Sequence, residues 1–298
     1  MKNPIRARGR GLRVRRRIHL TLLPAPADTG IVFRRVDLPG RPRIPVCPGN
    51  LDPAESRLTL RSPAAGGNAS VTGVEHLLSA FAGLGVDNVC IETDAPELPV
   101  MDGSAGPFVF LVQAAGITEL AAARRFIRLR RRVEVALGRS WVRLEPYDGF
   151  KASVTLGPDH PGCEGQPQAV SIDFSTASFI KEISRARNLL GTAPAAPGAG
   201  AAACAAGRDD DAGSGMRRET APGGEGPRYR DEFVKHKLLD AIGDLYLLGH
   251  PLMAAYSAYQ AGHALNRRLL DTLQANPETW ESVIFDGAAA VDLRRAGS

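Results

Sequence analysis

Residues 231–249 combine apolar positions at helical spacing with a line of polar side chains. The apolar positions recur every three or four residues and predict an amphipathic helix: Val234, Leu238, Ile242 and Leu245. His236, Asp240 and Asp244 follow at steps of four, so a helix places them above one another on one face. The spacing predicts that this line forms the polar side of the helix.

Residues 74–84, VEHLLSAFAGL, predict a second helix by the same spacing of Val74, Leu77, Leu78 and Phe81. His76 points away from that apolar stripe, and Glu75 lies at its flank. Further helices are predicted at 107–115, 179–190 and 262–274.

Alternation of apolar and polar residues predicts strands between these helices. The strands fall within residues 4–70 and 87–92, then within 126–146, 153–157 and 169–175. Strands followed by helices in each half indicate an α+β fold, with helices on one face of each sheet. We predict two domains, residues 1–122 and 123–298, with a ligand site in the cleft between them.

One stretch departs from these patterns. Residues 191–227 consist largely of Ala, Gly and Pro, and Met216 is their only large apolar residue. Such a composition buries too little apolar surface to offset the entropy of an ordered chain. We therefore expect this segment to be disordered.

Composition narrows the class of protein. The chain has 298 residues and is 44% hydrophobic, which suits two globular cores, and no apolar run reaches the length of a membrane span. The four cysteines form no CxxC motif and no evident disulfide framework, which favours the cytoplasm.

The net charge of +5 is concentrated in residues 1–20 and 124–132. Such blocks suit nucleic acid, an anionic membrane surface or a phosphate-rich substrate, and the second block also suits a linker or the guard of an edge strand. A nucleic-acid module needs aromatic residues among its arginines, and RRFIRLRRR contains only Phe126.

The polar line suggests metal chemistry. His236 and Asp240 offer a nitrogen and an oxygen ligand suited to Zn²⁺, and His76 is a candidate third ligand. Glu75 could activate water, and His263, paired with Asp244, could protonate a leaving amine. Taken alone, a His and two Asp on one helix face are more typical of solvated surface than of a metal site, and so is the Glu75–His76 pair at a helix start. His250 suits a structural role at a helix end, and His19 and His160 lack a partner pattern.

Two long blocks carry a family resemblance. They read GVEHLLSAFAGLGVDNVCIETDAPELPVMDGSAGPFV, and DEFVKHKLLDAIGDLYLLGH followed by AYSAYQAGHALNRRLL. Both closely resemble the UDP-3-O-acyl-N-acetylglucosamine deacetylases, zinc amidases of bacterial lipid A synthesis. The resemblance covers most of residues 3–190 and 228–285.

The resemblance implies a role for each motif residue. His76, His236 and Asp240 match zinc ligands. Glu75 matches the base that activates water, His263 the acid and Asp244 its electrostatic support. Lys237 matches a substrate-contacting lysine, and Asn188 stands where the family has a Thr that helps to hold the oxyanion. The implied protein is a cytoplasmic monomer that binds an acylated nucleotide sugar and no nucleic acid.

Other departures keep alternatives open. Gly11-Leu12-Arg13 lacks the His that the family has at this point, and ESRLTLRS at 55–62 is also altered. The segment 191–227 replaces an element that lines the family's acyl passage. Three possibilities stand: a working deacetylase with a loosened acyl site and transient contact with the membrane surface, a poorly active zinc-binding relative, or a basic protein that binds nucleic acid or an anionic surface.

Overall fold

The structure is a computed structural model. It describes residues 1–53, 55, 57–62, 69–160, 163, 165–188 and 226–285. The prediction of disorder over 191–227 therefore concerns residues that, apart from 226 and 227, lie outside the described ranges. None of the helices in these ranges is both long enough and apolar enough to cross a membrane.

The N-terminal region is built on a five-stranded sheet in the order β1-β2-β7-β3-β4, with a separate β5-β6 hairpin. Its strands are β1 Ile5–Arg10, β2 Arg17–Pro24, β3 Ile31–Arg35, β4 Arg43–Pro45, β5 Thr59–Arg61, β6 Ser70–Thr72 and β7 Val89–Thr93. Its helices are η1 Pro48–Asn50, α1 Glu75–Leu84 and α2 Gly106–Ala115. Helix α1 ends at Gly85, whose φ of 68° places it in the left-handed conformation typical of a helix C-terminus.

The C-terminal region contains a seven-stranded sheet whose main path is β12-β11-β13-β10-β9, extended by β8 and β14. Its strands are β8 Arg125–Leu129, β9 Val133–Leu137, β10 Ser140–Pro146, β11 Phe150–Leu156, β12 Gln168–Asp173, β13 Leu252–Tyr259 and β14 Trp280–Ile284. Its helices are α3 Thr176–Ser178, the π-helix η3 Phe179–Ile183, α4 Glu232–Leu245, η5 Tyr246–Leu248, α5 His263–Ala275 and η6 Pro277–Thr279.

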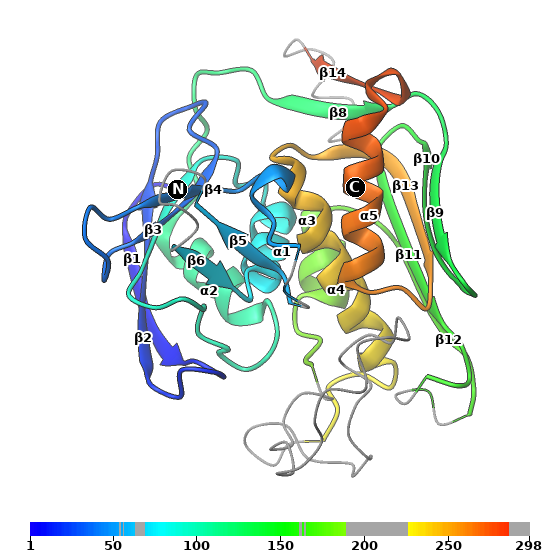
Figure 1. The fold of residues 1–298 in the computed structure, drawn as a ribbon, viewed down its shortest axis with the longest axis horizontal. Coiled ribbons are helices and arrows are strands. Elements are labelled where there is room, and N and C mark those ends of the chain that lie inside the picture. The colour runs from blue at the N-terminus through cyan, green and yellow to red at the C-terminus, as the bar shows by residue number, and fades with distance from the viewer. Residues whose placement is uncertain are drawn as a thin grey trace.

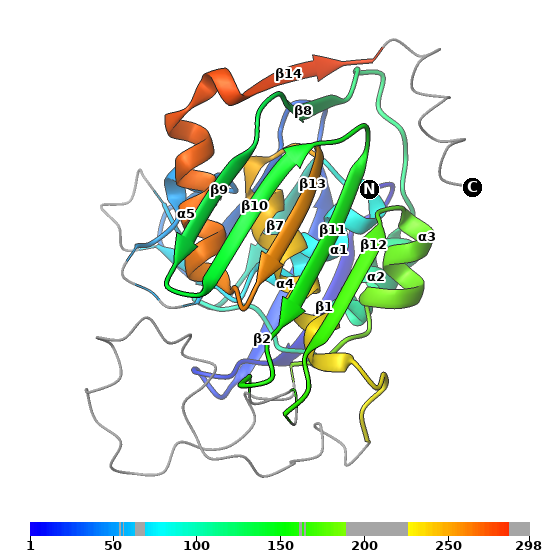
Figure 2. The same ribbon diagram turned by 90° about the vertical axis from the view of Figure 1, so that its right-hand side faces the viewer.

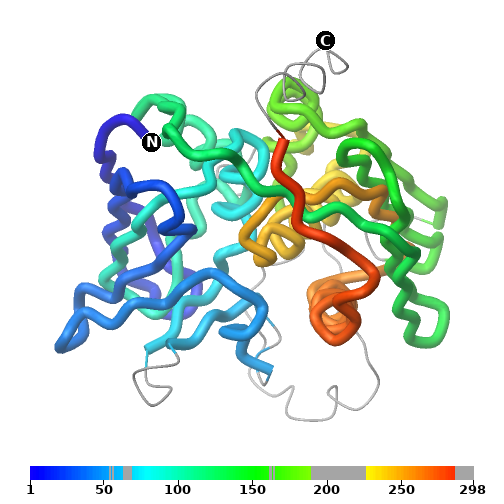
Figure 3. Tube along the Cα trace, turned by 90° about the horizontal axis from the view of Figure 1, so that it is seen from above, coloured from blue at the N-terminus to red at the C-terminus, as the bar shows by residue number. Residues whose placement is uncertain are grey.

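The helices of the two regions face each other between the two sheets (Figure 1). Figure 2 shows α4 and α5 covering one face of the C-terminal sheet, and Figure 3 shows the two halves side by side. Contact is close where α1 meets α4, because a Cβ added to Gly243 would lie 2.1 Å from the backbone oxygen of Glu75. A Cβ on Gly83 would likewise lie 2.1 Å from the Phe179 ring. Two glycines therefore allow the halves to approach.

The expected α+β class with two sheet-containing regions is confirmed. The division near residue 122 stays a prediction. Two local expectations were wrong. The helix predicted over 179–190 ends at Ile183. The basic strand β8 is not an edge, because it pairs with both β13 and β14. Strand β14 went unpredicted because Trp280–Ile284 has weak alternation.

Candidate metal centre and its acid–base groups

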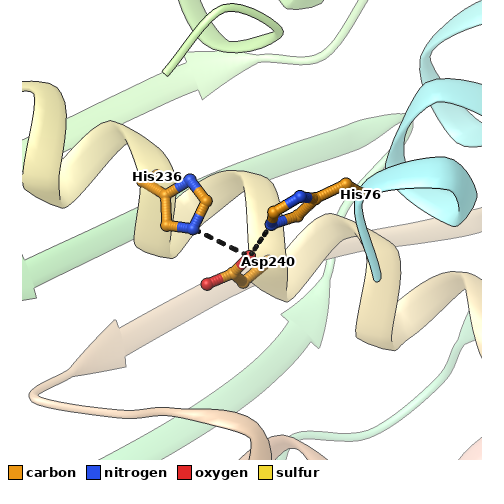
Figure 4. Close-up of side chains that lie close together, drawn as sticks. All are labelled: His76, His236 and Asp240. Carbon is orange, nitrogen blue, oxygen red and sulfur yellow. Dashed lines mark ion pairs between the residues drawn. The ribbon is translucent and has the colours of Figure 1, made fainter. Parts of the chain in front are cut away.

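Helices α1 and α4 bring three side chains from distant parts of the chain together. His76 lies in the first turn of α1, and His236 and Asp240 are one turn apart on α4. The Oδ1 atom of Asp240 is 3.3 Å from Nε2 of His76 and 3.4 Å from Nε2 of His236 (Figure 4). One donor atom from each residue lies within 4.8 Å of the others. The role of these residues as metal ligands stays a prediction.

The polar line of α4 is buried, which corrects the expectation of an ordinary polar helix face. His236 and Asp240 are 4% and 6% exposed, and Asp244 is 1% exposed. The opposite stripe of α4 is buried as well, because α4 lies between its own sheet and α1. Buried ionisable groups need partners or a ligand, so a solvated face no longer accounts for this line.

A hydrogen bond at Nδ1 fixes the orientation of His236. Its Nδ1 lies 3.0 Å from the carbonyl oxygen of Ala186, which can only accept. Nδ1 therefore carries the proton and Nε2 presents its lone pair. Metal-binding histidines commonly donate their other ring N–H to a backbone carbonyl in this way. The next residue, Arg187, is anchored by a buried ion pair in which its Nε lies 2.8 Å from Oε1 of Glu232.

These donors fit a metal ion. Nε2 of His236 and Oδ1 of Asp240 are buried, yet neither makes a hydrogen bond. Two ligands of a tetrahedral Zn²⁺, each about 2.0–2.1 Å from the ion, lie about 3.3 Å apart, close to the two separations from Asp240. Two imidazoles and a carboxylate are also a donor set that zinc accepts.

The electrostatics of α4 keep its own two candidate ligands, His236 and Asp240, in the forms that bind metal. Burial lowers the pKa of His236, so its imidazole stays neutral. Burial alone would raise the pKa of Asp240, but the neighbouring histidines outweigh it and hold this pKa well below its usual range. A neutral imidazole and an ionised carboxylate are the states that bind metal.

Glu75 begins α1 immediately before His76. Burial raises the pKa of its carboxyl group, and its Oε2 is a buried atom without a hydrogen-bond partner. A raised pKa makes the carboxylate a stronger base. This position and state suit proton abstraction from water.

His263, the first residue of α5, is paired with Asp244. Its Nδ1 lies 2.9 and 2.8 Å from the two carboxylate oxygens of Asp244. Burial alone would lower the pKa of His263, but the charge and hydrogen bond of Asp244 outweigh it and raise this pKa to about 10. His263 is therefore a cation at neutral pH, with Nε2 as the ring nitrogen left for a substrate.

The two predicted substrate contacts lie near this group. Asn188 lines a pocket together with Glu75 and His76, and its backbone N–H donates to Gly103. The same pocket has an apolar wall that includes Leu12, Leu98, Pro99, Val100 and Phe108. Lys237 is buried beside His236 on α4, and its charge contributes to lowering the pKa of that imidazole. Their substrate-binding roles stay predictions.

Sequence reasoning missed several supports of this site. The backbone oxygen of Ala186 leaves no trace in the residue pattern. Gly243 and Asn266 do leave a signal, because they stand next to Asp244 and three residues after His263. Asn266 donates to Asp244 from Nδ2 at 2.8 Å. Both could have been suspected once the helices were predicted.

Comparison with known proteins places this geometry in context. The model of the UDP-3-O-acyl N-acetylglycosamine deacetylase family matches residues 1–275. UDP-3-O-acyl-N-acetylglucosamine deacetylase of Thioalkalivibrio sulfidiphilus is 46% identical, over 96% of this chain and 92% of its own length. The proteins of that name from Nitrosococcus oceani and Cellvibrio japonicus are 47% and 45% identical, over 96% and 98% of this chain and 92% and 95% of theirs. The chain belongs to the UDP-3-O-acyl N-acetylglycosamine deacetylase family.

Proposed function

We propose that this chain removes acetate from UDP-3-O-acyl-N-acetylglucosamine, the deacetylation step of lipid A synthesis, with Zn²⁺ held by His76, His236 and Asp240. The family match and the buried donor group support this function over a basic nucleic-acid or surface-binding protein. Both Glu75 and His263 are also present, which favours an active enzyme over a relative that only binds zinc.

Apart from what zinc supplies, the chemistry comes from side chains of the protein. When bound, zinc polarises the acetamide carbonyl and makes a nucleophilic water available near neutral pH. The Glu75 carboxylate takes a proton from the water as its oxygen adds to the acetyl carbon. His263 gives its Nε2 proton to the glucosamine nitrogen as the C–N bond breaks and acetate leaves. Asp244 keeps His263 protonated before this transfer.

The surroundings suit an amphipathic sugar substrate. We propose that Asn188, in the wall of the pocket, donates to the developing oxyanion, and that Lys237 contributes positive charge toward the diphosphate. The apolar wall of the same pocket can pack against an acyl chain, which gives the substrate a second anchor.

One observation carries the proposal. Two buried atoms that can bind a metal ion, Nε2 of His236 and Oδ1 of Asp240, have no hydrogen-bond partner. They lie 3.4 Å apart beside His76. Leaving such atoms unsatisfied destabilises a folded protein by about 1–3 kcal/mol each. A cation bound by both atoms would satisfy them and offset that cost.

The test is acetate release from the acylated UDP-sugar by the purified chain, together with its zinc content. We expect about one zinc per chain, activity that a chelator removes and zinc restores, and a Glu75→Gln variant that keeps its zinc but loses about 10²–10⁴ in kcat. Glu145→Gln, at an exposed carboxylate of β10, is the matched control and should match the parent. Zinc-loaded parent protein that releases no acetate would overturn the proposal.

A further inference from the structure

A buried chain of hydrogen bonds continues behind His263. Asp244 accepts from His263 on one side and from Nδ2 of Asn266, 2.8 Å away, on the other. The Asn266 amide in turn accepts at Oδ1 from the hydroxyl of Tyr256, 2.6 Å away. Asp244, Asn266 and Tyr256 are each no more than 3% exposed, so solvent does not compete for these contacts.

Three secondary-structure elements supply the residues of this hydrogen-bond chain. His263 and Asn266 are three residues apart on the first turns of α5, and therefore share a face that meets Asp244 near the end of α4. Tyr256 lies on the central strand β13, paired with β10 and β11. The sheet thus anchors the far end of the hydrogen-bond chain, and the first turn of α5 carries the imidazole.

The chemistry of each group sets the direction of the chain. An ionised carboxylate only accepts, so Asn266 must turn its NH₂ toward Asp244 and its oxygen away. That oxygen then needs a donor, and Tyr256 is the group placed to supply one. Burial and the charge of Asp244 raise the pKa of Tyr256, so its hydroxyl keeps its proton.

We propose that Asn266 and Tyr256 are positioning residues for proton donation: Tyr256 locks the Asn266 amide, which holds the Asp244 carboxylate against Nδ1 of His263. His263 is thereby oriented with Nε2 toward the substrate before binding. This inference rests on the proposed function, because it assigns a task to the acid of that reaction. Neither residue touches the reacting atoms, so both act through Asp244.

Two nearly isosteric variants test the chain. Tyr256→Phe removes the donor that locks the amide, and should lower kcat about three- to tenfold, the value of one buried hydrogen bond. Asn266→Asp keeps an acceptor for Tyr256 but sets a carboxyl group against Asp244, and should lower kcat more. In both variants KM and zinc content should stay at parental values, because neither Tyr256 nor Asn266 contacts the substrate or the candidate metal ligands.

A spectroscopic measurement separates positioning from stability. The hydrogen-bonded Nδ1 proton of His263 should give a low-field signal in proton NMR of protein labelled with nitrogen-15 histidine. This signal should shift or broaden in Tyr256→Phe. The matched control is Tyr246→Phe, whose buried hydroxyl donates to Val86 and Asp87 instead. It should lose similar thermal stability but keep the signal, because these contacts do not reach His263.

The outcomes are decisive in each direction. Parental kcat and an unchanged His263 signal in Tyr256→Phe would overturn the proposal, even if Asn266→Asp failed to fold. Equal loss of the His263 signal in the Tyr256 and Tyr246 variants would show a structural role only and would also overturn it. The NMR signal needs no turnover, so failure of the deacetylase function would leave this test intact and distinguishable.

Discussion

Two polar groups share α4 but draw on different parts of the molecule. The metal group combines His236 and Asp240 with His76, which comes from the other half of the chain. The acid pair combines Asp244 with His263, and both belong to the C-terminal region. The metal group therefore exists only when the two halves dock, whereas the acid pair forms within one of them.

This difference shows what the interface between the halves contributes. At Gly243 the backbone of α1 approaches α4 so closely that no side chain fits between them. Glu75 and His76 are carried by that same turn of α1, so the docking distance sets how far both lie from His236 and Asp240. The hydrogen bonds that hold the acid pair, in contrast, lie within the C-terminal region, on α4, α5 and β13.

The largest effect is expected from His236→Ala, which removes one donor of the metal group. Bound zinc should fall to background. Activity should drop by a larger factor than the rate enhancement of about 10²–10⁴ that one acid–base group supplies. The low-field NMR signal of His263 should survive, because the acid pair does not depend on the metal group. Zinc content equal to the parent would contradict the ligand assignment. Loss of the His263 signal would contradict the independence of the pair.

Much of the metal group and of the acid pair could be predicted from the residue pattern. The steps of four from His236 to Asp244 predicted one line on one helix, and α4 carries them so. Burial of that line was not predictable, because it depends on α1 packing against it from a segment about 160 residues earlier. The hydrogen bond from His236 to Ala186 was hidden for the same reason, since backbone atoms carry no sequence signal.

The helix predicted over 179–190 shows a second limit. One continuous helix was predicted, but its helical part, Phe179–Ile183, is a π-helix that ends there, and Ala186 lies beyond it within reach of His236. Such local irregularities are frequent at functional sites and oppose the simple period. Sequence periodicity therefore predicted the elements of the site better than it predicted their ends.

An intermediate effect is expected from Asp244→Asn, which disturbs the acid pair alone. Asp244 holds the pKa of His263 near 10. Without its charge this pKa should fall toward about 6.5, so the alkaline limb of kcat/KM moves to lower pH and activity at pH 8 drops by about thirtyfold. The sign follows because the protonated imidazole is the active form.

The pH profile of kcat/KM and the zinc content check this prediction. Zinc should stay at the parental level, in contrast to His236→Ala. Asp271→Asn, at an exposed carboxylate of α5, should leave the profile unchanged. An alkaline limb that stays in place in Asp244→Asn would show that another group supplies the proton.

The smallest effect is expected from Gly243→Ala, which tests docking itself. Within a helix, Gly→Ala normally stabilises by up to about 1 kcal/mol. Here the new Cβ would lie 2.1 Å from the Glu75 oxygen, so α1 must move away, and we expect a net loss of about 1–3 kcal/mol in unfolding free energy. Activity should fall by about tenfold or less as Glu75 and His76 withdraw from α4.

Chemical denaturation, zinc affinity and the NMR signal of His263 together check the prediction for Gly243→Ala. Gly49→Ala is the matched control, because a Cβ there meets no atom within 4 Å and the backbone conformation is ordinary. It should leave all three measurements near parental values. Gly243→Ala should weaken zinc binding while the His263 signal persists. Increased stability with undiminished zinc affinity would mean that α1 and α4 tolerate a wider spacing. The metal group would then not depend on the close docking that separates it from the acid pair.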